Sequence, residues 1–308
     1  MTTSRPPRPP HPLRLGPRSV AALSLVSLVG VLAFCWPLFA DAGSAVTSHA
    51  GDAPWLFAAL LPLLVAVVVA TIADRGMDAK AVAMLGVLAA VGAALRPLGA
   101  GTAGLEPMFF LMVLSGRVLG PGFGFVLGSV TMFASALLTG GVGPWMPFQM
   151  LSMGWFTMGA GLLPGPREVP PARAKPRAWG SPRGRAELLM LSVYGFVAAF
   201  AYGTVMNLQG WVLLQSPGSS GISFVPGAPL HENLVRFLAY VLATSLGWDL
   251  GRAALTVVLT LTVGGTLLRA LRRATRRANF EAQVTFEAPE RPSPSEAPHR
   301  TYITYDPK

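Results

Sequence analysis

The sequence Gly116-Arg-Val-Leu-Gly120-Pro-Gly-Phe-Gly124-Phe-Val-Leu-Gly128 has a glycine at every fourth position, and no charged residue follows Arg117 until Arg167. A soluble domain cannot keep so long an apolar stretch dissolved, whereas a bilayer can. Because Pro121 interrupts the pattern, we expect a bend or a helix-turn-helix at this point. Glycines at this spacing let neighbouring helices approach closely, which either serves packing alone or encloses a ligand.

The composition indicates a polytopic membrane protein. Only 12% of the 308 residues are charged, about half of what soluble domains carry, and the mean hydropathy is +0.51. The net charge of +10 comes from short basic blocks between apolar segments, which argues against nucleic acid as a partner. The single cysteine excludes an internal disulfide, and the four histidines share no metal-ligand spacing. We therefore expect no metal and no cofactor.

Eight apolar segments are candidates for membrane-spanning helices, each of which needs about 20 residues. They are Val20–Phe39, Trp55–Ala73, Ala79–Leu95, Pro107–Leu119, Gly122–Leu138, Met146–Leu163, Leu188–Leu208 and one segment within Asn233–Leu268. The fourth is short enough to be broken or re-entrant. The last is too long for one simple crossing, so it can begin on the membrane surface or tilt strongly. These segments predict an all-α helix bundle with about eight spans.

The ends of the chain differ from this membrane domain, which we place at residues 19–277. Residues 1–18 form a basic tail and residues 278–308 a polar tail rich in proline, and we expect both to be disordered. The arginines before Val20 also resemble the start of a signal peptide, with a cleavage site near Ala40–Ala42. We favour a retained helix because the apolar run is long enough to span.

Basic residues indicate the orientation of the bundle. They gather in the N-terminal tail, in the loop from Pro164 to Arg185 and directly after the last segment. Basic loops remain on the cytoplasmic side, and an even number of crossings places these three there together. We therefore predict a multi-pass protein of the cell membrane with cytoplasmic N- and C-termini.

The segment Val142–Gln149 combines helix-breaking residues with aromatic and polar ones at the predicted outer face. One interpretation is an aromatic anchor at the membrane–water interface. The other is the rim of a solute pocket, in which Trp145 stacks on a flat ligand and Gln149 forms a hydrogen bond to it.

Charged and amide residues close to the apolar segments are further candidates for ligand contact. Arg96 and Glu106 bracket a glycine-rich loop, which is either a gate latched by the two charges or a solvated loop. Asp249 and Arg252 lie three residues apart within the last segment, where charges are unfavourable in lipid. This pair is either a functional site or an ion pair on one helix face. Asn207 ends the seventh segment on the outer side.

Two stripes of small residues recur at a spacing of four. One consists of Gly86, Ala90 and Ala94, and the other of Gly195, Ala199 and Gly203. Such stripes mostly serve packing within one bundle, and a minority are docking faces for a membrane partner. No Walker A motif is present, so the chain is not itself an ATPase, and no HExxH or GxSxG motif points to hydrolysis. We therefore expect no enzymatic activity.

Four stretches make the chain resemble the substrate-binding S components of energy-coupling-factor (ECF) transporters of the actinobacterial type. They are Gly116–Phe125, Thr139–Met150, Ala201–Leu208 and Thr244–Asp249. The resemblance covers roughly residues 79–277. It implies a bundle of typically six helices, with Val20–Phe39 and Trp55–Ala73 as additions before this core.

The resemblance also implies a function. Such a subunit captures a vitamin or related micronutrient at the outer face and docks onto a transmembrane T component, which couples it to two cytoplasmic ATPase subunits. The docking face is a small-residue stripe on the first core helix, which corresponds here to Ala90 and Ala94, continued by Gly86. The expected substrate contacts are Arg96, Glu106, Trp145, Gln149, Asn207 and Asp249. No motif indicates which micronutrient is bound.

Two other functions remain compatible with the sequence. A membrane-embedded enzyme acting on a lipid or an isoprenoid requires Glu106, Asp249 and Arg252 to converge in space. A stand-alone secondary transporter usually contains inverted repeats, which the sequence does not display.

Overall fold

The protein is known here from a computed structural model, which describes residues 17–39, 61, 62, 64, 65, 68, 79–99, 103–164, 182–211, 221–225 and 227–278. All elements in these ranges are helical, which confirms the predicted all-α class for this part of the chain. They are α1 (Pro17–Phe39), α5 (Ala79–Leu95), the short η1 (Pro97–Gly99), α6 (Met108–Leu119), α7 (Pro121–Thr139), α8 (Met146–Leu162), α9 (Pro182–Trp211), α10 (Leu230–Thr244), α11 (Leu246–Thr262) and α12 (Gly264–Ala278). The predicted tails and most of Trp55–Ala73 lie outside the described residues.

Several of these helices are long and apolar enough to cross a membrane. Three meet this condition within the described residues, namely Ala79–Gly99, Pro121–Thr139 and Gly184–Trp211. A fourth is added if α11 and α12 together form one bent span. The chain thus has the helices of a membrane protein, but the predicted number of eight spans is not confirmed.

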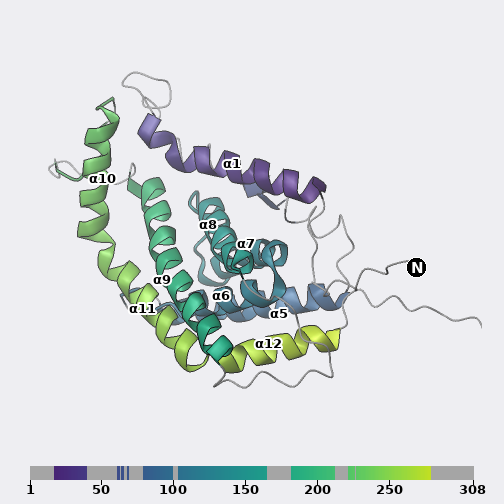
Figure 1. The fold of residues 1–308 in the computed structure, drawn as a ribbon. Coiled ribbons are helices and arrows are strands. Elements are labelled where there is room, and N and C mark those ends of the chain that lie inside the picture. Colours follow the sequence, from purple (N-terminus) through teal and green to yellow (C-terminus); the bar gives the residue numbers. More distant parts are fainter. Residues whose placement is uncertain are drawn as a thin grey trace, which may run out of the picture.

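The predicted last segment, Asn233–Leu268, is three helices instead of one crossing. The chain breaks at Ser245 between α10 and α11 and at Val263 between α11 and α12. The axes of α11 and α12 differ by 70°. Through Phe237 and Tyr240, α10 packs on Trp211 at the end of α9. The segment is too long for one crossing because it includes parts of two further helices, α10 before α11 and α12 after it (Figure 1).

The short α6 is the central helix of the bundle. All of its twelve residues are buried, and it contacts α5, α7, α8, α9, α11 and α12 (Figure 1). Twelve residues extend over about 18 Å, less than the roughly 30 Å of a bilayer core. Because other helices surround it, α6 needs no length that matches the bilayer.

The glycine ladder joins three helices closely. Gly120, with φ +90°, ends α6, and Pro121 is the first residue of α7, so the predicted helix-turn-helix is confirmed. A Cβ atom on Gly116 or Gly128 would overlap a backbone carbonyl of α8. The most extensive helix contact of the described chain accordingly joins α7 and α8.

The two small-residue stripes have different surroundings. Gly195 and Gly203 pack directly against Thr256 and Asp249 of α11, so this stripe serves contact within the bundle. The earlier glycine of α9 meets the later residue of α11 and the later glycine meets the earlier one, so the two helices run antiparallel. By contrast, Gly86, Ala90 and Ala94 of α5 are all exposed, and a Cβ on Gly86 would meet no atom within 4 Å.

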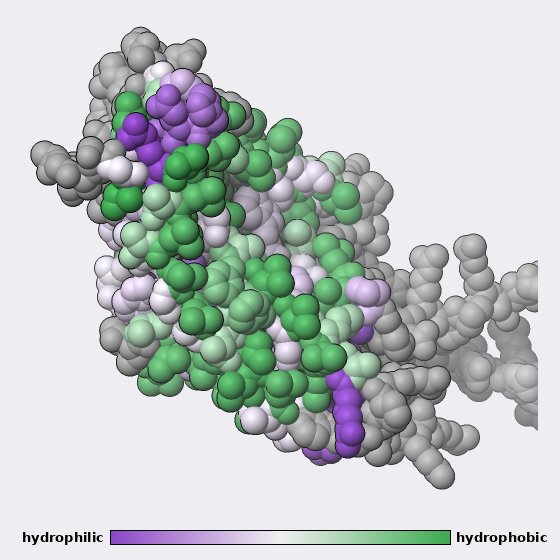
Figure 2. Space-filling view, turned by 60° about the vertical axis from the view of Figure 1, so that its left-hand side comes forward, coloured by the Kyte–Doolittle hydropathy of each residue, from purple (hydrophilic) through white to green (hydrophobic). Residues whose placement is uncertain are grey.

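The surface of the bundle is largely apolar. Figure 2 shows hydrophobic residues spread over the visible face between hydrophilic patches at its two ends. Leu25, Val87, Leu189, Val197, Leu238 and Val258 are among the large hydrophobic side chains that are more than half exposed. Water does not favour such a surface, whereas lipid chains cover it without penalty.

A network of charged side chains ties α6, α9 and α12 together at one end of the bundle. Nε of Arg117 lies 3.0 Å from Oε1 of Glu187, and Nη2 of Arg272 lies 2.6 Å from the same oxygen. Arg117 also donates to the carbonyl of Leu163, at 2.9 Å. We call this the Arg117 end. The opposite end of α6 carries a second charged cluster.

Candidate functional site

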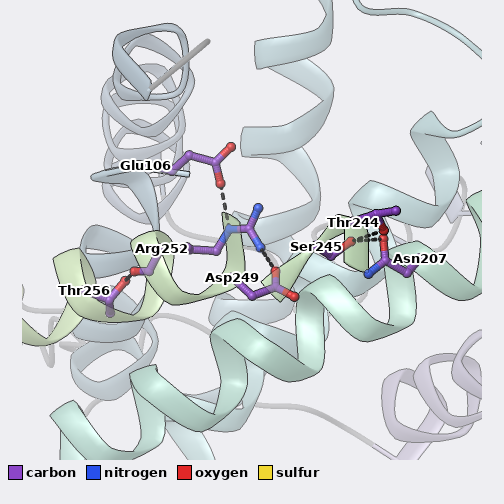
Figure 3. A network of polar contacts seen from close by, with 7 residues as sticks. All are labelled: Glu106, Asn207, Thr244, Ser245, Asp249, Arg252 and Thr256. Carbon is purple, nitrogen blue, oxygen red and sulfur yellow. Dashed lines mark hydrogen bonds and ion pairs between the residues drawn. The ribbon is translucent and has the colours of Figure 1, made fainter. Parts of the chain in front are cut away.

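The second cluster is built around Arg252, in the second turn of α11. Its Nε lies 2.8 Å from Oε2 of Glu106, which comes directly before α6, and its Nη1 lies 2.7 Å from Oδ1 of Asp249 (Figure 3). The side chains of Asp249 and Arg252 are only 3% and 11% exposed. The predicted Asp249–Arg252 pair is present, and Glu106 joins it from a distant part of the chain.

Two aromatic rings cover the Arg252 guanidinium. Its central carbon lies 4.8 Å from the ring centroid of Phe109 and 5.2 Å from that of Tyr202. The two rings meet edge to face with centroids 5.0 Å apart. Cation–π contacts favour this placement of a guanidinium, more so where water is excluded. Two carboxylates and two rings thus fix the position of one positive charge.

The close approach of α9 and α11 brings Asp249 into the bundle. A Cβ on Gly203 would overlap the Asp249 carboxylate, so only glycine allows this contact. One turn further along α9, Oδ1 of Asn207 accepts a hydrogen bond of 2.9 Å from the Ser245 hydroxyl (Figure 3). The close packing at Gly203 therefore sets the position at which Asp249 of α11 faces α9 and Asn207 of α9 faces α11.

Two polar atoms of this cluster are buried without a hydrogen-bond partner among the described residues. They are Oδ2 of Asp249 and Nδ2 of Asn207, one an acceptor and the other a donor. Buried polar groups in folded proteins nearly always have a partner, so each exception needs an explanation. Here the pair offers a bound molecule one acceptor and one donor.

The loop that precedes α6 lies directly on α11. Ala103 and Gly104 have positive φ angles, +50° and +81°. A Cβ on Gly104 would overlap the Trp248 carbonyl, and a Cβ on Gly251 would overlap the Ala103 carbonyl. Backbone contact and the Glu106–Arg252 ion pair together hold the loop over the cluster.

Arg96 is not the partner of Glu106. Its Nη1 donates to the Ser135 hydroxyl of α7 at 3.4 Å. The hypothesis of a latch between Arg96 and Glu106 is therefore wrong in its cation. The residue that pairs with Glu106 is Arg252.

Trp145 and Gln149, in the segment Val142–Gln149, form no hydrogen bond with the Arg252 cluster. Trp145 is 42% exposed and donates from Nε1 to the Gly141 carbonyl at 3.2 Å. Oε1 of Gln149 is buried without a partner among the described residues. The structure gives no contact between either side chain and Arg252.

An apolar cavity of about 320 Å³ lies between α8 and α9. Its lining includes Trp155, Phe156, Tyr194, Val197 and Tyr202, and none of the six predicted substrate contacts. Tyr202 belongs to both the cavity and the aromatic cover of Arg252. A ligand pocket is typically about 300–1,000 Å³ and mostly apolar with few polar groups, and this cavity is within that range.

Sequence reasoning missed the aromatic members of the site. Phe109, Tyr202 and Trp155 lie in apolar segments, where an aromatic ring is equally typical of core or lipid-facing surface. Only the contact with Arg252 distinguishes Phe109 and Tyr202, and only the cavity distinguishes Trp155, and both depend on the fold. No group of three metal-binding side chains occurs in the described part of the chain.

A comparison of the chain with protein-family models, with curated proteins and with solved structures gives no match in any of the three.

Proposed function

We propose that this chain is the substrate-binding membrane subunit of an ECF-type importer. It captures a vitamin or related micronutrient at the outer face, and partner subunits drive the uptake with ATP. The observation that carries the proposal is the partly buried Glu106–Arg252–Asp249 cluster beneath the loop at one end of an apolar bundle. Charged side chains inside a membrane domain are unfavourable and are typical of substrate pathways.

The cluster and the cavity suit two parts of one ligand. Arg252, Asp249 and Asn207 offer charge, an acceptor and a donor, while Phe156 and the cavity wall offer apolar contact. Tyr202 lies between the two regions. A molecule with a flat or apolar part and a few polar groups matches this combination.

The loop before α6 acts as a cover in this proposal. When it lifts, the Glu106–Arg252 pair separates and leaves Arg252 with Asp249 alone. A polar group of the ligand then takes the place of the Glu106 carboxylate. Separating a buried pair is unfavourable unless another partner replaces it, so the ligand itself favours the open or rearranged state.

Two features of the chain support partner subunits in this proposal, namely the absence of a Walker A motif and an exposed face of small residues on α5. The chain has no Walker A motif, so ATP hydrolysis requires other subunits. The exposed Gly86, Ala90 and Ala94 give α5 a smooth face on which another helix can pack closely. We assign this face to the transmembrane T component, which two cytoplasmic ATPase subunits would drive.

An enzyme acting on a lipid is the second candidate, because Glu106, Asp249 and Arg252 converge as that function requires. Arg252 lies 2.8 Å from an oxygen of Glu106 and 2.7 Å from one of Asp249, however, and a cation this close favours the ionised form and makes each carboxylate a weaker base. This candidate predicts a lipid product that accumulates with time when the purified chain is incubated with lipids extracted from its native membranes. The product must disappear in Asp249→Asn.

Retention of a small molecule tests the proposed binding site. The wild-type chain, purified from its native membranes, should release a defined small molecule on denaturation, detected by mass spectrometry. Arg252→Gln should abolish retention, whereas Arg236→Gln, which alters a partly exposed pair in α10 with N–O distance 3.9 Å, should not. Equal retention by Arg252→Gln and the wild type would exclude the cluster as the binding site.

A further inference from the structure

The last described helix, α12, carries five arginines on one side. They are Arg269, Arg272, Arg273, Arg276 and Arg277. A helix turns by about 100° per residue, so these five positions fall within about half of its circumference. Leu268, Leu271 and Thr275 lie on the opposite side and are 3%, 6% and 1% exposed. The helix thus uses its apolar side to pack on the bundle and directs its charges outward.

Three of these arginines have no role in the packing. Arg272 bonds to Glu187 and thereby fixes α12 to α9. Arg273, Arg276 and Arg277 are exposed and form no ion pair with another described residue. They therefore form a positive surface, and the described residues provide no negative charge that pairs with it.

The position of α12 relates this surface to the membrane. Its axis makes an angle of 70° with that of α11, so it lies close to the membrane plane if α11 crosses the bilayer (Figure 1). Val258, Leu261 and Val263, at the end of α11, are about half exposed and apolar. The arginine side of α12 therefore begins where a lipid-facing apolar surface ends.

We propose that Arg273, Arg276 and Arg277 bind the phosphate groups of anionic phospholipids in the leaflet at the Arg117 end. Guanidinium groups bind phosphate with paired hydrogen bonds. Basic clusters directly beside a membrane span attract anionic lipids. The apolar end of α11 accommodates the acyl chains of the same lipid. An acidic protein partner would bind the arginines but would leave this apolar surface without a role. This proposal is independent of any ligand at Arg252.

The test measures lipid binding to the purified full-length chain in detergent, by native mass spectrometry. The probes are dioctanoyl phosphatidylglycerol and dioctanoyl phosphatidylcholine. The wild-type chain should bind the anionic lipid about tenfold more tightly or better, since each basic side chain at such a surface contributes about fivefold. The combined variant Arg273→Gln, Arg276→Gln and Arg277→Gln should lose this preference. The matching Arg→Lys variant should keep most of it.

A second variant controls for net charge. Arg5→Gln, Arg8→Gln and Arg14→Gln remove the same charge from the N-terminal tail and should lower the lipid preference much less than the α12 variant does. Thermal unfolding of all variants should agree with the wild type, because Arg272 is retained.

The proposal is overturned if the wild type shows no preference for phosphatidylglycerol, or if the α12 glutamine variant retains it. It is also overturned if the tail variant loses as much, because bulk charge would then explain the binding. Unchanged lipid binding together with loss of a co-purifying protein in the α12 variant would assign these arginines to a protein contact instead.

Discussion

Nε of Arg252 lies 2.8 Å from Oε2 of Glu106, although 146 residues separate the two along the chain. The pair joins α11 to the loop that leads into the central helix α6. Because the Arg252 guanidinium also lies against Phe109 of α6 and Tyr202 of α9, a single side chain of α11 contacts the loop and two further helices at this end of the bundle.

Replacing Arg252 by methionine should strongly destabilise the fold. The substitution leaves the Asp249 carboxylate, 3% exposed, without its cation. Removing one partner of a buried ion pair costs about 3–5 kcal/mol. Thermal unfolding of the detergent-solubilised chain measures this. Arg236→Gln, in a partly exposed pair with Glu232, should cost no more than about 1 kcal/mol. Equal losses in both variants would contradict the role given to Arg252.

Gly203→Ala should separate α9 from α11. The added methyl group would overlap the Asp249 carboxylate, and overpacking of this kind costs about 1–3 kcal/mol. Gly210, in the same helix, has open space around its Cβ position. Gly210→Ala should therefore lie between no change and about 1 kcal/mol of added stability. Unfolding temperatures of the two variants decide the point, and the account fails if their order is reversed.

Gly128→Ala should disrupt the contact between α7 and α8. Its methyl group would overlap the Met153 carbonyl, a backbone atom that cannot move aside alone. We expect a loss of about 1–3 kcal/mol and a lower yield of folded protein on gel filtration. Gly86→Ala, on the open face of α5, is the control and should behave like the wild type. A neutral Gly128→Ala would show that the ladder is not required for packing.

Larger side chains on the exposed α5 stripe should impair docking without unfolding the protein. Gly86, Ala90 and Ala94 are exposed, so Ala90→Leu and Ala94→Leu add apolar surface that lipid accepts. The close helix contact that a partner needs would be lost. The amount of ATPase subunit recovered per chain should fall, with an unchanged unfolding temperature. Val87→Ala, at the neighbouring exposed position, is a matched control that should leave recovery unchanged.

Periodicity and hydropathy sufficed to locate most helices. The predicted Ala79–Leu95 agrees with α5 at both ends, and the start of α8 at Met146 was also predicted. The breaks at Ser245 and Val263 were missed, because neither position has a proline and glycines such as Gly247, Gly264 and Gly265 do not by themselves end a helix in an apolar segment. The breaks allow α10 to pack on α9 and α12 to pack on α6. Such contacts between distant parts of the chain cannot be read from a local sequence pattern.

The candidate site was predictable only in part. Buried charges in apolar segments drew attention to Asp249 and Arg252, since lipid disfavours them. The third member, Glu106, was paired with Arg96 because the two are close in sequence, whereas the fold brings in Arg252 from a distant helix. Tyr202 and Phe109 carried no signal, because a ring beside a guanidinium looks like any core aromatic in the sequence.

The central claim is that this chain works as the binding subunit of an ATP-driven importer, and isolation of the intact complex tests it most directly. The tagged chain is purified from its native membranes in a mild detergent, and every co-purifying protein is identified by mass spectrometry. The account predicts recovery of one small transmembrane partner and two ATPase subunits. Recovery of the chain alone, under conditions that preserve other membrane complexes of the same cells, would contradict it.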